Sequence, residues 1–183
     1  MEYTDFDDSK EKRREYLKLL LPKEYASSIF TINIDRLFKN GIRGIIIDLD
    51  DTLLPRGVYK IPFAVYSWIE KVKEYGIKIC LVSNGSSSKR IEYVSNSLGI
   101  KGFAFSLKPL PFALKKAMAY LKTSPEQTAI IGDQILTDIL GGNLVKAHTI
   151  LVKPVAEEVS LVRMPMRFVE NFLINFLKLE IDS

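Results

Sequence analysis

Short runs of apolar, β-branched residues alternate along most of this chain with longer stretches that have one apolar face. Such runs are typical of strands buried on both faces, and the longer stretches are typical of amphipathic helices. The pattern predicts strands at 42–49, 77–83, 102–105, 128–131 and 149–152, and helices at 63–75, 88–98, 111–121 and 137–147, the last broken at Gly141-Gly142. Outside this alternation we expect a charged helix over 9–20, a helical or mixed segment over 23–40 and a helix over 165–179. The alternation indicates an α/β fold, a three-layer doubly wound parallel sheet with helices on both faces.

The first of the central strands ends in an acidic run, Asp48-Leu49-Asp50-Asp51-Thr52-Leu53, directly after Gly44-Ile45-Ile46-Ile47. Strand side chains alternate between faces, so Asp48, Asp50 and Thr52 project to one side where the strand ends. Carboxylates at the end of a buried strand are rarely left unpaired, because desolvating them is too costly. The pattern therefore predicts a positive partner, of which a metal ion is the simplest. A polar turn that closes the strand is the alternative.

Three later strand ends carry polar residues in the same way. The first is Ser83-Asn84-Gly85, followed by serines that can begin a helix. A hydroxyl, backbone N–H groups and a helix N-terminus together suit a phosphate.

The second of these strand ends is Ser106-Leu107-Lys108-Pro109, in which Pro109 keeps Lys108 out of helical conformation. The third is Gly132-Asp133-Gln134-Ile135-Leu136-Thr137-Asp138. Sites in parallel sheets lie at the carboxyl ends of the strands, so we expect the four motifs to form one site.

In this order the four motifs resemble those of the haloacid dehalogenase (HAD) superfamily, phosphohydrolases with an aspartate nucleophile, over roughly residues 42–151. A narrower resemblance is to the subfamily IIIA phosphatases, which include the phosphatidylglycerophosphate phosphatases. It rests on residues 132–143, 108–112 and 21–30. Asp51 departs from the pattern, since many relatives carry Asn there; it adds a negative charge beside the site. The resemblance implies a HAD-like Rossmannoid fold and a phosphomonoester hydrolase.

The resemblance also implies a role for the acidic residues. Asp48 is the expected nucleophile, which forms an aspartyl-phosphate, and Asp50 is the expected general acid and base. The implied cofactor is Mg2+, held by the Asp48 carboxylate, the Asp50 backbone carbonyl and Asp133, with waters completing an octahedron.

The remaining polar residues of the motifs are expected to serve the phosphate and to support the acids. Ser83, Lys108 and the backbone N–H groups near Asn84 hold the phosphoryl oxygens in this scheme. Asp138 lies behind the metal or orients Lys108, and Thr52 orients the loop.

Composition limits the compartment and the partners. A chain of 183 residues with 47% hydrophobic content can bury one core, so we expect a single domain over 1–183 with its core at about 42–152. One cysteine, Cys80, and one histidine, His148, exclude a disulfide framework and the usual zinc sites and favour the cytoplasm. We expect no signal peptide at the acidic N-terminus, and no run approaches the ~20 apolar residues of a membrane span. The net charge of +4 is spread along the chain, which argues against nucleic-acid binding.

The spacing of the motifs bears on the substrate. Thr52 and Ser83 are 31 positions apart, and Ser83 and Lys108 are 25 apart, which leaves room for a loop, a helix and a strand each time. No cap domain fits into these connections, so we expect an open site that suits a large or embedded substrate. Together with the resemblance, this favours phosphatidylglycerophosphate, in which the phosphate sits on a lipid headgroup.

Three alternatives stay open. A HAD phosphatase with this site can act instead on a phosphosugar, histidinol phosphate or a phosphoprotein. A phosphorylation-controlled signalling domain shares the sheet, but it has no need of Asp50, an acid that speeds hydrolysis. A catalytically inactive HAD scaffold is disfavoured, because every chemical position is filled.

Two amphipathic segments are candidates for peripheral contact with the inner face of an anionic membrane. The C-terminal stripe consists of Phe168, Val169, Phe172, Leu173, Phe176 and Leu177, flanked by Arg163, Arg167 and Lys178. The N-terminal segment consists of Tyr16, Leu17, Leu19, Leu20 and Leu21 with Arg13, Arg14 and Lys18. In the alternative, both segments pack on the domain and cover the sheet.

Overall fold

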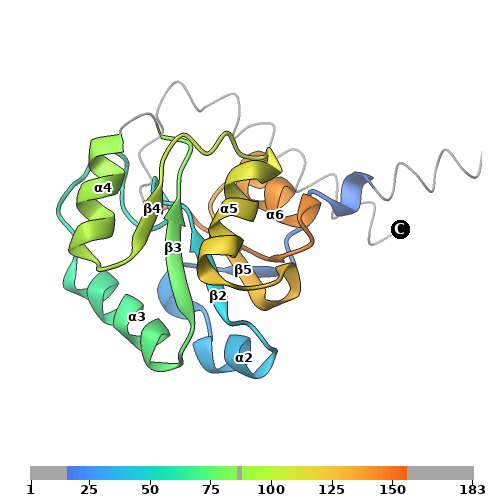
Figure 1. Cartoon of the computed structure of the whole chain (residues 1–183), viewed down its shortest axis with the longest axis horizontal. Coiled ribbons are helices and arrows are strands. Elements are labelled where there is room, and N and C mark those ends of the chain that lie inside the picture. The colour runs from blue at the N-terminus through green and yellow to red at the C-terminus, as the bar shows by residue number, and fades with distance from the viewer. Residues whose placement is uncertain (1–15, 86–87, 156–183) are drawn as a thin grey trace, which may run out of the picture.

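The computed structural model describes residues 16–85 and 88–155, which form a parallel sheet flanked by helices (Figure 1). The strands in these residues are β1 Glu24–Ala26, β2 Gly44–Ile47, β3 Lys78–Val82, β4 Lys101–Phe103, β5 Thr128–Gly132 and β6 His148–Val152. The α-helices are α2 Ile34–Lys39, α3 Phe63–Glu74, α4 Ser88–Ser97, α5 Pro111–Leu121 and α6 Leu140–Leu144. Two 3-10 turns, η1 Ile29–Thr31 and η2 Pro125–Gln127, and a π-helix, η3 Ile135–Ile139, lie between them, and residues 16–18 are helical. The predicted fold class is confirmed.

The strand order β1-β6-β5-β2-β3-β4 determines where a site can form. From β2 the chain winds outward through β3 to β4, then returns to β5 on the other side of β2 and continues to β6. All five pairs of neighbouring strands are parallel. The winding therefore reverses between β2 and β5, and ligands of such sheets bind beyond the carboxyl ends of the strands at this point.

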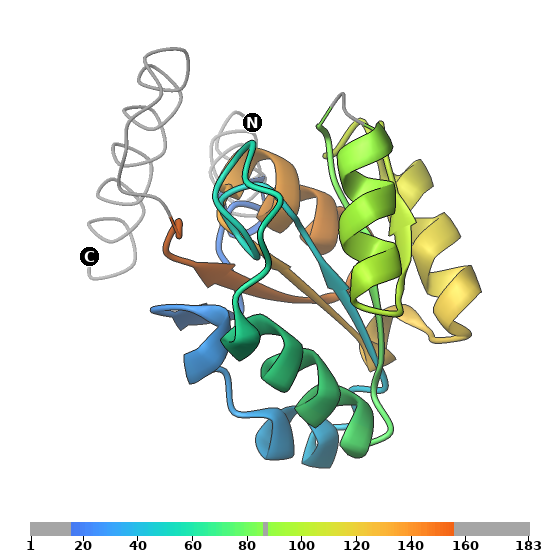
Figure 2. The ribbon, with the colours of Figure 1, turned by 90° about the vertical axis from the view of Figure 1, so that its left-hand side faces the viewer.

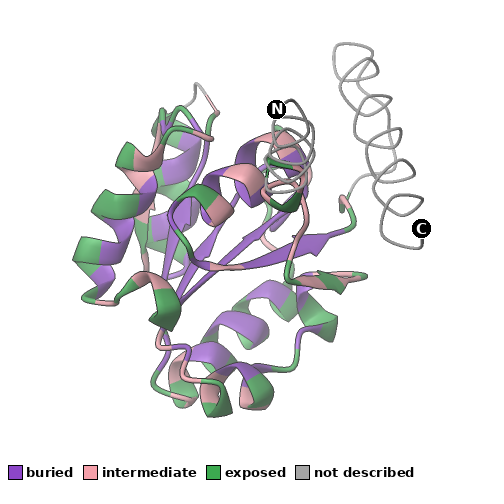
Figure 3. Ribbon diagram, turned by 90° about the vertical axis from the view of Figure 1, so that its right-hand side faces the viewer, coloured by how far each residue is buried: buried purple, intermediate pink, exposed green. Residues whose placement is uncertain are grey.

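Each face of the sheet has its own hydrophobic core, and the strand periodicity assigns residues to them. Ile45 and Ile47 of β2 pack in the cluster that contains Ile69 of α3. Ile46 between them packs in the cluster that contains Leu114 of α5. Figure 2 shows the two helical layers on either side of the sheet, and Figure 3 shows the buried strands between them. Burying each such side chain stabilises the fold by roughly 1.5–3 kcal/mol.

Strand β1 was not predicted, because residues 23–40 were expected to be helical or mixed. Only three residues long, β1 exists through its pairing with β6, in which Tyr25 lies beside Leu151. The Lys23 amide donates to Thr149 Oγ1 at 3.1 Å, and the Lys153 amide donates to the Ala26 carbonyl at 3.3 Å. A strand that depends on a partner more than 120 residues away leaves no local hydrophobic pattern to find.

The predicted helix break at Gly141-Gly142 is wrong, because α6 runs through both residues directly after η3. The glycines serve close packing instead. A Cβ at Gly142 would lie 2.4 Å from Thr149 Cγ2, and one at Gly141 would lie 3.2 Å from Leu114 Cδ1. Their missing side chains let α6 approach both β6 and α5.

The amphipathic segments have different outcomes. In the N-terminal one, Leu20 packs against Ile135, Ile139 and Leu151, and Asn143 Nδ2 donates to the Leu19 and Leu21 carbonyls at 2.8 and 2.9 Å. This part therefore packs on the domain, as the alternative held. The predicted helix over 165–179, with its apolar stripe, lies outside the described residues. No helix among the described residues has the length and apolar character needed to span a bilayer.

Candidate active site

The predicted site residues converge at the carboxyl edge of the sheet. Asp48 follows β2, and its amide donates to the Ile131 carbonyl at 2.9 Å, so the first acid stays in register with β5. Asp133 directly follows β5, at the point where the winding reverses. Thr52, Lys108 and Asp138 contact these two acids directly or through one another. Asn84 binds the loop that carries Lys108, and Ser83 lies beside Asp50.

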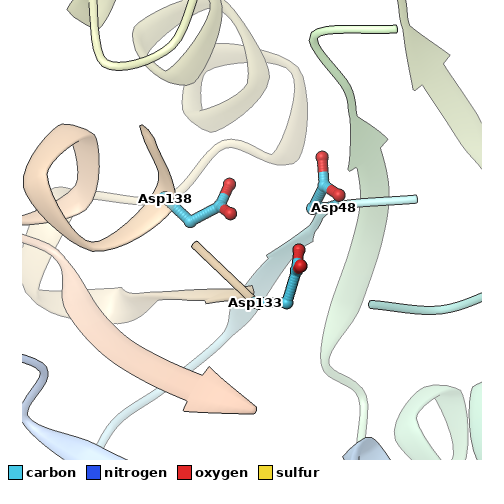
Figure 4. Close-up of side chains that lie close together, drawn as sticks. All are labelled: Asp48, Asp133 and Asp138. Atoms are coloured by element: carbon cyan, nitrogen blue, oxygen red, sulfur yellow. The ribbon is translucent and has the colours of Figure 1, made fainter. Parts of the chain in front are cut away.

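Three buried carboxylates form the centre of the site. Asp48, Asp133 and Asp138 each offer one oxygen within 4.8 Å of the others, and Figure 4 shows the three side chains close together, with Asp138 directed toward the other two. Like charges this close repel each other unless cations lie between them. Carboxylate oxygens are the hard donors that small divalent cations prefer, so this cluster fits such an ion by its donor type and spacing.

Lys108 supplies one of the cations. Its Nζ donates to Asp48 Oδ1 at 2.7 Å, to Asp138 Oδ1 at 2.5 Å and to the Val82 carbonyl at 2.9 Å. Burial alone lowers the pKa of Lys108, but Asp138 and Asp48 raise it above the usual value, so the lysine stays charged. Burial raises the pKa of Asp48 to about 6, against the opposing attraction of Lys108. At neutral pH Asp48 is therefore predominantly an ionised carboxylate.

Asp138 contacts Lys108, which is one of the two arrangements that the sequence analysis expected for Asp138. Its Oδ2 accepts from the Gln134 amide at 3.2 Å and from Thr137 Oγ1 at 3.3 Å, both in or beside η3. A Cβ at Gly132 would lie 2.2 Å from Asp138 Cγ. The glycine at the end of β5 is therefore what lets the Asp138 carboxylate fold back toward the sheet.

Asp50 has a cationic partner that the sequence analysis missed. Arg90 of α4 forms a buried ion pair with Asp50 through Nη1, while its Nη2 and Nε donate to the Pro55 and Val58 carbonyls at 2.9 and 3.1 Å. One side chain thus holds the acid and the loop that follows it. A signal was present, because Arg90 shares a helical face with the buried Ile91 and Val94 and is the only charge on that face among the described residues.

Asn84 acts through its side chain on the loop that carries Lys108. Its Oδ1 accepts from the Lys108 amide at 2.7 Å and from Ser106 Oγ at 2.5 Å, and its Nδ2 donates to the Lys108 carbonyl at 2.9 Å. Ser83 Oγ accepts from the Gly85 amide at 3.0 Å and lies 3.5 Å from Asp50 Oδ2. The side-chain amide of Asn84 therefore fixes the loop that carries Lys108. The backbone N–H groups near Asn84 are the ones that the sequence analysis expected to bind phosphate.

The turn after Asp50 supports the cluster. Thr52 Oγ1 donates to Asp133 Oδ1 at 3.0 Å. Asp51 has a φ of +66°, a left-handed conformation that Asn and Asp tolerate better than most residues. Its Oδ1 accepts from the Arg56 amide at 3.1 Å, so the charge of Asp51 is turned toward the loop.

Comparison with known families identifies the class that this fold and site define, the HAD-type phosphatases. The chain belongs to the family described as mitochondrial PGP phosphatase, whose profile matches residues 15–156. It is thus a phosphoric monoester hydrolase, as the four motifs indicated.

Individual relatives agree with this assignment. "Probable phosphatase YqeG" of Bacillus subtilis (strain 168) is 37% identical over 161 residues, which cover 88% of this chain and 93% of that protein. Two solved structures share the fold alone. An uncharacterized protein from Listeria monocytogenes serotype 4b has a TM-score of 0.53 at 21% identity, covering 75% of this chain and 99% of the other. The cobalt-bound deoxy-D-mannose-octulosonate 8-phosphate phosphatase of Haemophilus influenzae has a TM-score of 0.50 at 20% identity, covering 62% and 69%.

Proposed function

We propose that this phosphatase removes the terminal phosphate of phosphatidylglycerophosphate in phospholipid synthesis, with Mg2+ as its cofactor and Asp48 as its nucleophile. The observation that carries the substrate proposal is the family match over residues 15–156, which include every site residue. The connection between β2 and β3 supports it. Residues 48–77 form one loop and α3, with no inserted domain above the carboxylates. A phosphate on a lipid headgroup can reach an edge that is open in this way.

The first half of the reaction falls to Asp48. Its Oδ1 accepts from Lys108, which leaves Oδ2 to attack phosphorus. A bond forms between Oδ2 and phosphorus while the bond from phosphorus to the leaving oxygen breaks. Asp50 donates a proton to that oxygen, and phosphatidylglycerol departs as the neutral alcohol. Ser83 and the backbone N–H groups near Asn84 hold the phosphoryl oxygens during the transfer.

The second half regenerates the enzyme. Asp50, now ionised, takes a proton from a water molecule, whose oxygen attacks the phosphorus of the aspartyl-phosphate. The Asp48–phosphorus bond breaks, inorganic phosphate leaves, and Asp50 again holds its proton. Arg90 holds the Asp50 side chain in one place through Oδ1, and Oδ2, which lies 3.5 Å from Ser83 Oγ, carries the proton in both transfers.

The residues for Mg2+ are Asp48, Asp133 and the backbone carbonyl of Asp50. The supporting observation is the chemistry of the donors, because two of the three clustered carboxylates come from these positions. The ion would add positive charge beside the phosphoryl oxygens. Thr52 and Lys108 meanwhile fix Asp133 and Asp48 from the protein side.

Activity on a substrate panel tests the proposal. Purified protein is given phosphatidylglycerophosphate in detergent micelles, soluble phosphosugars and phosphopeptides, with Mg2+ or with chelator. We expect the lipid to have the highest kcat/KM and chelator to abolish turnover. Asp48→Asn, which keeps the side-chain shape, should lose on the order of 10⁴-fold in kcat. The matched control is Asp35→Asn on α2, an exposed acid paired with Lys39.

The outcomes separate the parts of the proposal. Turnover of soluble phosphosugars or phosphopeptides above that of the lipid would overturn the substrate assignment and favour the alternative of a phosphometabolite or phosphoprotein phosphatase. Full turnover in chelator would contradict the requirement for Mg2+. Retention of more than about a tenth of the activity in Asp48→Asn would contradict the assignment of Asp48 as the nucleophile.

A further inference from the structure

The loop that carries Lys108 presents an unusual set of side chains to solvent. Phe105, Leu107, Leu110 and Phe112 are 57, 68, 49 and 75% exposed, and together we call them the apolar loop face. Figure 1 shows this stretch of chain passing from β4 to α5 along the carboxyl edge of the sheet, where the site lies. Four exposed large apolar groups within eight residues are the kind of apolar surface that marks an interaction site.

The backbone is bent to keep these groups outside. Phe105 and Leu107 have φ angles of +50° and +53°, a left-handed conformation that bulky residues adopt at a cost. Between and after them, Ser106 and Lys108 are buried, and Asn84 binds both. The Asn84 side chain therefore holds Ser106 and Lys108 on the inside of the loop, and Phe105 and Leu107 lie on the outside. Glycine would adopt these angles freely, so the apolar side chains are retained against local strain.

Aromatic surface continues beside the loop. Phe105 and Phe112 line a groove of about 690 Å³ between β4 and α5, together with Phe103 and Tyr120. Lys116 lies over the Phe103 ring at 5.8 Å from its centroid. The apolar loop face therefore borders further aromatic surface with a cation above it.

The chain segment that contains the loop carries charge of one sign. Residues 93–125 contain no acidic residue, and their lysines are Lys101, Lys108, Lys115, Lys116 and Lys122. Lys108 is used inside the site, but Lys115 and Lys116 are exposed in the first half of α5. Lys89 is exposed in the first turn of α4. Exposed apolar groups with flanking lysines complement a surface that is apolar inside and anionic outside, which is an anionic bilayer.

We propose that the apolar loop face inserts into the upper acyl region of an anionic membrane and seats the carboxyl edge of the sheet on the lipid surface. This inference deepens the proposed function and rests on it, because a lipid substrate is the reason for the site to meet a membrane. Leu107 and Lys108 are adjacent, so insertion of one brings the other to the depth of a headgroup phosphate.

Vesicle binding by a glycine pair tests the contact. Phe105→Gly/Leu107→Gly removes two apolar side chains and relieves the left-handed strain, so the melting temperature should be unchanged or higher. Co-sedimentation with phosphatidylglycerol/phosphatidylcholine vesicles should fall at least about tenfold, since each lost side chain removes buried apolar area. The control is Phe63→Ser, which removes an aromatic ring that is 84% exposed on α3, in the other helical layer.

Two further arms separate charge from insertion. Lys115→Glu/Lys116→Glu should weaken binding to the anionic vesicles, and raised salt should weaken wild-type binding, whereas Lys71→Glu on α3 should not weaken it. Phe112→Trp should be quenched by brominated acyl chains. The natural tryptophan, Trp68, is buried in α3 and should not be quenched, so the wild type is the reference.

Failure of this proposal differs from failure of the proposed function. Turnover of micellar phosphatidylglycerophosphate with no vesicle binding, or with binding that the glycine pair leaves intact, would overturn the membrane face and keep the substrate. Vesicle binding through the face without turnover of the lipid would keep the face and overturn the substrate. If Phe112→Trp is not quenched while the protein sediments with vesicles, insertion is excluded.

Discussion

Asp48 and Asp50 are two residues apart, both buried, and held by different cations. Asp48 meets Lys108, which also binds Asp138 and a strand carbonyl. Asp50 meets Arg90, which also binds two carbonyls of the following loop. The lysine thus links one acid to another within the carboxylate cluster, whereas the arginine links its acid to the surrounding backbone.

The difference fits two kinds of chemistry. A nucleophile must stay ionised next to other carboxylates, and a compact ammonium group that two acids share supports this. An acid that gives and takes a proton must stay in one place through both steps, and a planar guanidinium that two loop carbonyls fix holds it there. Each side of the site can be broken separately, and the predictions below do so.

Removal of the shared lysine should have the largest effect. Lys108→Met leaves two buried carboxylates without their cation, so the free energy of unfolding should fall by about 3–5 kcal/mol. Turnover should fall at least about 10²-fold as well. Urea denaturation measures the first and aryl phosphate hydrolysis the second. Lys116→Met, at an exposed position of α5, should change the free energy of unfolding by less than about 0.5 kcal/mol. A stable Lys108→Met protein would show that Asp48 and Asp138 do not need the ion pair.

Loss of the arginine should affect stability less and proton transfer more. Arg90→Met should cost about 2–4 kcal/mol, because a buried acid and two carbonyls lose their donor. Its kcat should fall further for an alkyl phosphate than for an aryl phosphate, whose better leaving group depends less on Asp50. Arg90→Lys should recover part of the stability. Equal losses on both substrates would mean that Arg90 supports the fold without positioning the acid. Arg56→Met, at a half-exposed side chain beside Asp51, is the control.

A matched pair of glycines perturbs each side by one methyl group. A Cβ at Gly132 would meet Asp138 Cγ at 2.2 Å, and one at Gly85 would meet Asp50 Oδ2 at 2.8 Å. Gly132→Ala should destabilise by about 1–3 kcal/mol, since strand β5 cannot shift away. Gly85→Ala should cost less, because one oxygen at 2.8 Å has to move less than Asp138 Cγ and Cβ at 2.2 and 2.4 Å. Thermal melts of the two variants measure which one is less stable. A larger loss of stability in Gly85→Ala than in Gly132→Ala would contradict this prediction.

The sole histidine should give the smallest effect and serves as the reference for acid titrations. Burial lowers the pKa of His148, against the attraction of Glu24. The folded protein therefore binds fewer protons than the unfolded chain, and stability should fall as the pH drops through the ordinary histidine value of 6.5. His148→Gln should flatten this part of the stability–pH curve without changing turnover. A steeper curve in the variant would mean that His148 gains a proton on folding.

Hydrophobic periodicity was enough to predict the central sheet, because β2, β3 and β5 are apolar runs buried on both faces. It could not predict β1, whose pairing with β6 is set by tertiary contact. The four motifs likewise located the acids and Lys108. The ion pair of Arg90 with Asp50 and the hydrogen bond between Asn84 and Ser106 were missed, since both depend on how segments distant in sequence meet in space. The proposed chemical roles themselves stay predictions.

The central claim is that Asp48 becomes phosphorylated during turnover while Asp50 moves the proton. Wild type, Asp48→Asn and Asp50→Asn are each mixed with an aryl phosphate and Mg2+, quenched in acid and reduced with borohydride, which converts an aspartyl-phosphate to homoserine. Peptide mass mapping then locates the reduced residue. We expect homoserine at position 48 in the wild type, more of it in Asp50→Asn because its hydrolysis is slowed, and none in Asp48→Asn. Homoserine at any other aspartate, or its persistence in Asp48→Asn, would contradict the account.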